Sequence, residues 1–177
     1  MPTSRIPDDI RPALEELRDY MHGFYPERME SDPFPLEFWR IEDDELFYEV
    51  LGYLPLKMPM SEDGSVDLES LPEGYRLAYP IFSIEDDYFI NGWTALTNAG
   101  ERLLPSAIAA YDRIGMVSEA RALQAALESC RRAPNDDDAA EAAYKSVPNA
   151  YADDERKFEA LVSFFRTHAN LFEQDDA

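Results

Sequence analysis

The chain has 177 residues, of which 37 are Asp or Glu and 16 are Lys or Arg, so its formal net charge is −21. This charge excludes unassisted binding to nucleic acid or to anionic lipid. Hydrophobic residues make up 45% of the chain and aromatic residues 12%, which is too apolar for a disordered acidic tail. We therefore predict an acidic protein that folds around a core of its own.

Two helices are predicted in the N-terminal part of the chain. Apolar residues at helical spacing predict the first from Asp9 to Met21, with Asp9 as its cap. Two prolines within residues 31–35 then predict an extended linker. The second helix follows the acidic turn 42–45, with an apolar stripe at Leu46, Phe47, Val50, Leu51 and Leu54 and with Pro55 as its end.

The rest of the chain continues the helical pattern after a loop predicted for residues 55–72. A helix is predicted to run through Pro80, and Gly100 and Gly115 are predicted to end later helices. The helices expected here span residues 75–82, 87–98, 103–114, 116–132, 136–144 and 153–171. No long alternating run indicates a strand. The predicted fold class is all-α, a compact irregular bundle of about seven to nine helices with long Pro-rich loops in the N-terminal half.

The negative charge is concentrated in the two ends of the chain. Residues 1–74 carry 19 acidic and 6 basic side chains, residues 75–134 carry 7 and 6, and residues 135–177 carry 11 and 4. We expect residues 1–70 to form an acidic helical segment that packs on or extends a core of residues 71–177, within one structural domain. The nearly neutral middle of the chain favours a directed electric field over uniform adaptation to salt, although salt adaptation remains a hypothesis.

The cysteine content and the lengths of the apolar runs indicate the cellular compartment of the protein. Cys130 is the single cysteine, which excludes an internal disulfide and favours a reducing compartment. Residues 1–30 lack the pattern of a signal peptide, and no uncharged apolar run is long enough to span a bilayer. We predict a cytoplasmic protein with no membrane partner.

The motifs of catalysis and cofactor binding are absent from the sequence. The two histidines, His22 and His168, lie far from any nucleophile signature. No glycine-rich phosphate loop occurs, and no cluster has the spacing of a metal site. We therefore predict that the protein is not an enzyme and uses no cofactor and no metal, although an enzyme with an unrecognised carboxylate or metal site is kept as an alternative.

Four acidic clusters are the candidate partner-binding residues. Three of them stand at predicted helix starts, where capping and the helix dipole also favour carboxylates. The functional interpretation is that clusters on rigid helices imitate the phosphates of duplex DNA and attract a basic protein. The candidates are Glu42, Asp43, Asp44, Glu45, Glu85, Asp86, Asp87, Asp136, Asp137, Asp138, Asp153, Asp154 and Glu155.

One stretch of the chain also carries a family resemblance. Asn91-Gly92-Trp93 followed by Asn98-Ala99-Gly100, with the lead-in Leu77-Ala78-Tyr79-Pro80-Ile81-Phe82, is similar to the strongest motif of the DNA-mimic protein family. These are small, acidic, all-helical bacterial proteins, and the resemblance covers residues from about 71 to 172. Asn91 stands where the family has a glycine, and residues 1–70 have no clear counterpart. The motif residues Asn91, Gly92, Trp93, Asn98 and Gly100 are expected to serve structure, as turn caps and core.

The resemblance implies a helical, dimeric protein whose acidic face blocks a DNA-binding partner such as a transcription regulator. The charge distribution points to the same class of partner, so we predict a basic protein partner and no direct contact with nucleic acid. An immunity protein that neutralises a toxin, for example a nuclease, is the alternative that the same acidity supports.

Overall fold

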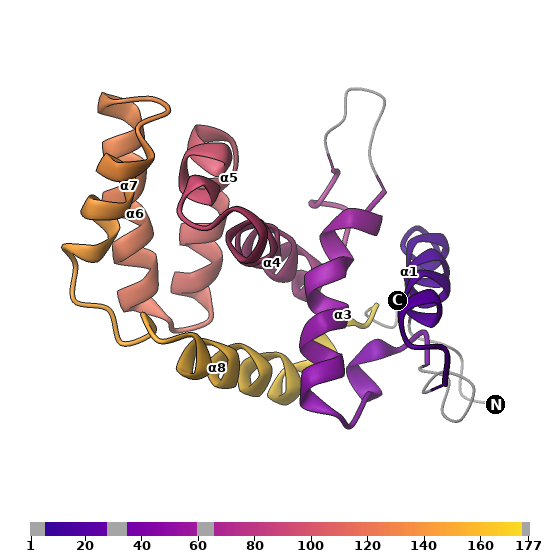
Figure 1. Cartoon of the computed structure of the whole chain (residues 1–177). Helices are drawn as coiled ribbons and strands as arrows, with labels where there is room; N and C mark the ends of the chain where they lie inside the picture. The colour runs from indigo at the N-terminus through magenta and orange to yellow at the C-terminus, as the bar shows by residue number, and fades with distance from the viewer. Residues whose placement is uncertain (1–5, 28–34, 60–65, 175–177) are drawn as a thin grey trace. The chain divides into compact units, whose positions relative to one another are not determined.

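The computed structural model describes residues 6–27, 35–59 and 66–174, and helices occupy most of these ranges (Figure 1). None of the described residues forms a strand. The prediction of an all-α fold is therefore confirmed. The α-helices are α1 (Arg11–Phe24), α3 (Asp44–Lys57), α4 (Glu73–Asn91), α5 (Thr94–Arg113), α6 (Val117–Arg132), α7 (Asp137–Lys145) and α8 (Asp154–Thr167), and two 3-10 helices are η1 (Phe38–Arg40) and η2 (Ala169–Phe172).

The chain divides into two units by its internal contacts. Unit 1 consists of Met1–Ala78 and Val162–Ala177, and unit 2 consists of Tyr79–Leu161. Helices α4 and α8 each contribute residues to both units. The C-terminal residues are thus grouped with the N-terminal segment, which the sequence pattern did not predict.

Unit 1 is built around a cluster of aromatic rings. The ring of Phe172, in η2, lies with its centroid 4.9 Å from that of Phe38, 5.2 Å from that of Tyr75 and 5.8 Å from that of Trp39. All four side chains are buried. A Cβ atom at Gly74 would lie 2.7 Å from Cδ1 of Phe172, so glycine is required where η2 passes the start of α4. Contacts between aromatic rings therefore form a large part of the core of this unit.

Unit 2 contains α5, α6 and α7, which lie side by side in Figure 1. Small side chains allow these helices to approach closely. Gly92 and Gly115 have positive φ angles of 60° and 85° in the turns that begin α5 and end it, a conformation that favours glycine. The buried alanines of the three helices are Ala95, Ala99, Ala107, Ala110, Ala120, Ala122, Ala126 and Ala140.

Two helix ends near the N-terminus differ from the prediction. Helix α1 begins at Arg11 with Ile10 at its cap position and no side-chain cap, so Asp9 does not cap it. Helix α3 continues through Pro55 to Lys57, so Pro55 does not end it. Proline removes one backbone donor from the helix, but the two residues after it remain helical. The predicted linker 31–35 and the middle of the predicted loop 55–72 lie largely outside the described residues.

Helix boundaries in the middle of the chain also differ. The structure has one helix, α4, from Glu73 to Asn91, where two shorter helices were predicted. Gly100 was predicted to end a helix; its φ of 42° and ψ of −143° break the helical geometry there, but α5 continues beyond this kink to Arg113. Gly115 ends α5 as predicted. The last predicted helix is divided between α8 and η2.

Candidate functional site

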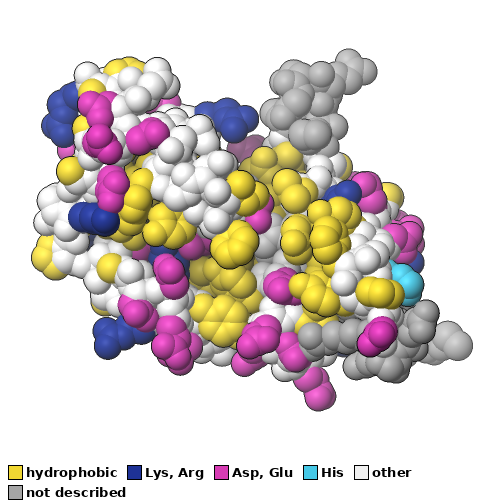
Figure 2. Space-filling model, viewed as in Figure 1, with side chains coloured by type: hydrophobic (Ala, Val, Ile, Leu, Met, Phe, Trp, Pro, Cys, Tyr) yellow, Lys and Arg dark blue, Asp and Glu magenta, His cyan; other side chains and the backbone are white. Residues whose placement is uncertain are grey.

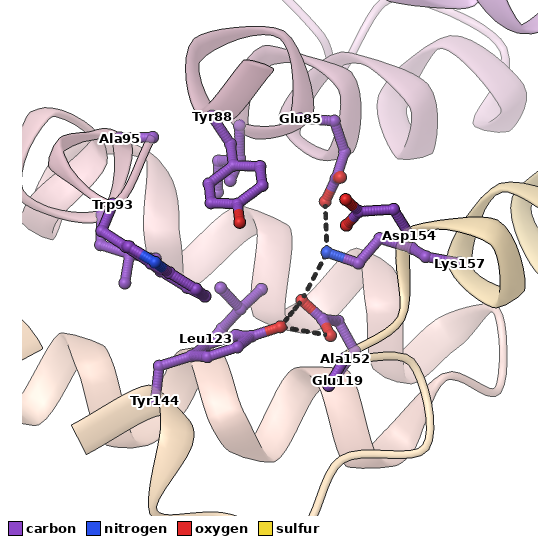
Figure 3. Close-up of a pocket in the computed structure, with 12 residues that line it drawn as sticks. Glu85, Tyr88, Trp93, Ala95, Glu119, Leu123, Tyr144, Ala152, Asp154 and Lys157 are labelled. Carbon is purple, nitrogen blue, oxygen red and sulfur yellow. Dashed lines mark hydrogen bonds and ion pairs between the residues drawn. The ribbon is translucent and has the colours of Figure 1, made fainter. Parts of the chain in front are cut away.

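Three charged side chains from different helices meet inside unit 2 (Figure 3). Nζ of Lys157, on α8, lies 3.2 Å from Oε1 of Glu85 on α4 and 3.3 Å from Oε1 of Glu119 on α6. Lys157 is only 8% exposed and Glu119 only 1%. Charges this deeply buried persist only when they are paired and hydrogen-bonded.

Hydroxyl and amide groups complete the hydrogen bonding of the two carboxylates. The Tyr144 hydroxyl lies 2.9 and 2.8 Å from the two carboxylate oxygens of Glu119 and donates to that carboxylate. Nδ2 of Asn149 donates to Oε2 of Glu119 at 2.5 Å. The Tyr111 hydroxyl donates to Oε1 of Glu85 at 2.5 Å. The network therefore joins α4, α5, α6 and α8 with α7 and the loop that follows it.

The network fixes the protonation of Lys157 and Tyr144 at neutral pH. Burial lowers the pKa of Lys157, but the negative charges of Glu85 and Glu119 raise it by more, so the pKa lies above its ordinary value. Burial raises the pKa of the Tyr144 hydroxyl. Lys157 is therefore a fixed cation and Tyr144 a neutral donor, and a protonated lysine is no nucleophile.

A small pocket opens beside this network. Its lining includes Tyr88, Trp93 and Asp154 and four members of the network, Glu85, Glu119, Tyr144 and Lys157. Figure 3 shows the Asp154 carboxylate facing the same space as Glu85 and Lys157. The ring centroid of Trp93 lies 5.0 Å from that of Tyr88 and 5.1 Å from that of Tyr144. The cavity volume is about 30 Å³, which is room for a water molecule or for the tip of one side chain.

Neither a metal centre nor a membrane span is found in the part of the chain that the structure describes. No group of three or more His, Cys, Asp or Glu side chains there is arranged to hold a metal ion. No helix there combines the length and the apolar composition needed to cross a bilayer. Cys130 is buried, and burial raises the pKa of its thiol, so it is not an activated nucleophile.

The acidic cluster of unit 1 lies at the start of α3. All four residues from Glu42 to Glu45 are exposed. Asp43 caps the helix, accepting a hydrogen bond from the backbone N–H of Leu46 at 2.8 Å. Asp44 pairs with Arg166 at 2.9 Å. Two of the four carboxylates thus have local structural roles, as the capping interpretation expected.

The cluster on α4 does not lie on the open surface. The Glu85 side chain is 12% exposed and belongs to the buried network. Asp87 accepts hydrogen bonds from the side-chain amides of Asn91 at 2.6 Å and Asn98 at 3.0 Å. Burial raises the pKa of Asp86, and so does the charge of Asp87. Glu85 is thus committed to the interior and Asp87 to local hydrogen bonds, which makes these two carboxylates poor substitutes for DNA phosphates.

The clusters at the starts of α7 and α8 are the most open acidic groups of unit 2. Asp136 accepts from the backbone N–H of Ala139 at 3.0 Å, and Asp153 accepts from that of Arg156 at 3.0 Å, so both cap their helices. Asp137 accepts from the hydroxyls of Thr94 and Thr97, which lower its pKa. The other cluster members, Asp138, Asp154 and Glu155, are exposed.

The family-motif residues lie at the end of α4, in the turn that follows it and in the first part of α5. Asn91 and Asn98 both donate to Asp87, which ties the end of α4 to the first turns of α5. Gly92 and Gly100 have positive φ angles. Trp93 is half-buried between Tyr88 and Tyr144.

Sequence reasoning missed Lys157 and Glu119, the buried charges of the site. Each lies one helical turn before a buried leucine, Lys157 before Leu161 and Glu119 before Leu123. A charged residue in the apolar stripe of a helix is the signal that would have indicated them. Their partners, however, come from helices distant in sequence, which the pattern does not identify.

The exposed charge of the protein is mainly negative. On the face drawn in Figure 2, Asp and Glu side chains are more common than Lys and Arg and lie in several separate groups. Hydrophobic side chains are exposed among them.

Comparison with known proteins gives one match. The model of a family described as DMP19-like protein matches residues 69–176, which is more than half of the chain. The matched range begins just before α4 and includes α5, α6, α7, α8 and η2. No curated protein and no solved structure matches the chain.

Proposed function

The chain belongs to the DMP19-like protein family, and we propose that its exposed carboxylates bind and block the DNA-binding surface of a basic protein such as a transcription regulator. The family match confirms the predicted resemblance to the DNA-mimic proteins. Membership indicates, in general terms, a DNA-mimic role in a non-enzymatic family. The family match does not identify the blocked protein, so the class of partner is our proposal.

One observation carries the proposal: exposed acidic clusters are held at the first turns of α7 and α8 by capping hydrogen bonds. A capped helix start fixes the backbone that carries the carboxylates, so their positions are set before a partner arrives. The two clusters lie at opposite ends of unit 2 in Figure 1. Helix α7 has 9 residues and is therefore about 13 Å long, so the negative charge is spread along the unit rather than gathered at a point.

The small pocket supports a binding protein better than an enzyme. Its cavity volume of about 30 Å³ is far below the several hundred Å³ that substrate pockets usually offer. Lys157 is held as a cation, and both neighbouring carboxylates are hydrogen-bonded. The polar groups of unit 2 thus stabilise the fold, while the free carboxylates outside face solvent.

The test is capture of the partner from the native host's lysate at low salt, with charge variants as matched baits. The first variant combines Asp136→Asn, Asp138→Asn and Glu155→Gln, which removes three negative charges and keeps a capping side chain at residue 136. The control combines Glu69→Gln, Asp112→Asn and Glu128→Gln, which removes the same charge from exposed positions outside the clusters.

We expect a basic DNA-binding protein to be retained by the unaltered chain and by the control variant, and to elute from the cluster variant at lower salt. Recovery of a toxin in place of a DNA-binding protein would move the function to immunity. Equal retention by both variants would show that net charge, and not the clusters, attracts the partner.

A further inference from the structure

Two polar groups at the mouth of the unit 2 pocket are without partners. Neither the Asp154 carboxylate nor the Tyr88 hydroxyl receives a hydrogen bond or an ion pair from the residues that the structure describes. By contrast, Oε1 of Glu85 is bound by Lys157 and Tyr111, and both oxygens of Glu119 accept hydrogen bonds, from Tyr144 and Asn149. The pocket therefore has one carboxylate and one hydroxyl that a ligand could engage.

The formal charge of the lining favours a cation. Glu85, Glu119 and Asp154 carry three negative charges, and Lys157 supplies the only positive charge among the residues that line the pocket. A net charge of −2 remains on these groups. Low-dielectric walls strengthen the field inside such a depression, so a cationic group is attracted to it.

The aromatic rings that line the pocket also favour a cation. Trp93 presents its ring beside Tyr88 and Tyr144 (Figure 3). The protein's own Lys145 places Nζ 4.9 Å from the centroid of the Trp93 ring, so this ring already makes one cation–π contact. A planar guanidinium stacks on such rings and binds a carboxylate through paired N–H groups, which an ammonium group cannot do equally well.

Exposed hydrophobic side chains on α4, the helix that contributes Glu85 and Tyr88 to the pocket lining, favour a ligand that is part of a protein. Phe89 is 88% exposed and Ile90 69%. Phe89 follows Glu85 by one turn on the same side of α4. An arginine surrounded by apolar contacts is the usual composition of an energetically dominant centre of a protein interface.

We propose that this pocket receives the guanidinium group of an arginine side chain on the partner protein. The guanidinium plane lies against the Tyr88 ring, beside the Trp93 ring that meets it at 66°, and its N–H groups donate to the carboxylate of Asp154. The pocket admits only the tip of the side chain, in keeping with its small volume. The proposal rests on the proposed function for the source of the arginine, because a basic DNA-binding surface supplies one.

The experiment is an NMR titration of the full chain with N-acetyl-arginine amide, with N-acetyl-citrulline amide as the uncharged probe of nearly the same shape. Shifts of the Trp93 indole N–H and of the Asp154 backbone amide report the pocket. Trp39, the only other tryptophan, belongs to unit 1 and is the internal control. Asp154→Asn removes the proposed ligand group, and Asp153→Asn changes the same charge on the neighbouring residue, which does not line the pocket.

We expect saturable shifts at Trp93 and Asp154 with the arginine probe, none at Trp39, and binding of the citrulline probe weaker by about tenfold. Asp154→Asn should weaken arginine binding by about threefold to tenfold, and Asp153→Asn by less than twofold. Absence of saturable shifts, equal binding of the two probes, or equal effects of the two substitutions would overturn the proposal.

The outcome is separable from that of the proposed function. If the lysate yields a DNA-binding partner but the arginine probe does not bind, the pocket assignment fails and the function stands. If the probe binds in the pocket but no DNA-binding protein is captured, the pocket assignment stands and the function fails.

Discussion

Unit 1 and unit 2 are both helical, but different side chains stabilise their interiors. In unit 1 the rings of Phe38, Trp39, Tyr75 and Phe172 fill the core. In unit 2 alanine-rich helices surround an ion pair network centred on Lys157. Ring packing has no preferred protonation state, whereas a buried network requires one. The stability of unit 2 should therefore depend on single charges, and that of unit 1 on shape.

The largest expected effect comes from Lys157→Met. This substitution leaves the carboxylates of Glu85 and Glu119 buried without their cation, which costs about 3–5 kcal/mol. The indole N–H signals of Trp39 and Trp93, followed by NMR during urea unfolding, report unit 1 and unit 2 separately. The Trp93 signal should be lost at much lower urea than in the unaltered chain.

The control for that prediction is the double variant Lys157→Met/Glu119→Gln. Removing the carboxylate charge relieves part of the desolvation cost, so the double variant should be more stable than Lys157→Met by at least about 1 kcal/mol. If the two substitutions destabilise additively, the ion pair is not the source of stability.

A matched pair of tyrosines compares the two cores directly. Tyr144→Phe removes a hydroxyl that donates to the Glu119 carboxylate and should destabilise the protein by about 1.5–3 kcal/mol. Tyr75→Phe removes a buried hydroxyl for which the described residues offer no partner, so stability should be unchanged or slightly higher. Urea unfolding followed by circular dichroism measures both, and equal losses would remove the distinction between the units.

Shape sensitivity in unit 1 is tested by Gly74→Ala. The new Cβ would lie 2.7 Å from Cδ1 of Phe172 and 2.9 Å from the backbone carbonyl carbon of Leu171. The ring and the backbone of η2 must both move, at a cost of about 1–3 kcal/mol. Gly52→Ala, at a helical glycine with open space around it, is the control and should be neutral or stabilising. Thermal unfolding of both variants measures the two changes in stability.

The smallest effect is a dependence on alkaline pH. The pKa values of Tyr144 and Lys157 are raised in the folded state above the ordinary values of 10.0 and 10.5. Groups with a raised folded pKa give their full stabilisation below the unfolded pKa and lose it as pH rises above that value. The stabilisation contributed by these two groups should therefore be constant below about pH 10 and should fall above it.

The same pH series separates the network from other groups. Tyr144→Phe should make the decline above pH 10 shallower, because one of the groups responsible is absent. Tyr75, whose pKa burial also raises, contributes a decline in unit 1. Urea unfolding at several pH values measures these slopes, and an unchanged slope in Tyr144→Phe would contradict the assignment.

Local features of this fold were predictable from the sequence because they depend on neighbouring residues. The helix spacing around α6 and α7, the turn at Gly115 and the capping roles of Asp136 and Asp153 follow from side chains within a few positions. Pro55 was misjudged because a proline near the end of a helix removes one donor without preventing the last residues from staying helical.

The site was much less predictable, because its members are distant in sequence. Lys157 and Glu85 are 72 positions apart, and no local pattern pairs them. Glu85 was predicted as an exposed phosphate substitute because its neighbours are acidic, yet its side chain turns into the core. A cluster of like charges in the sequence thus does not establish that every member faces solvent.

We propose that the exposed acidic clusters of α7 and α8 bind the surface of the partner protein that otherwise binds DNA. Competition between the chain and a fluorescent duplex for the captured partner, followed by anisotropy, tests it most directly. We expect the unaltered chain and the control variant Glu69→Gln/Asp112→Asn/Glu128→Gln to displace the duplex from the partner. The variant Asp136→Asn/Asp138→Asn/Glu155→Gln should need a concentration about tenfold higher for the same displacement. A stable ternary complex of this chain, the partner and the duplex would show that the clusters do not bind the DNA-binding surface.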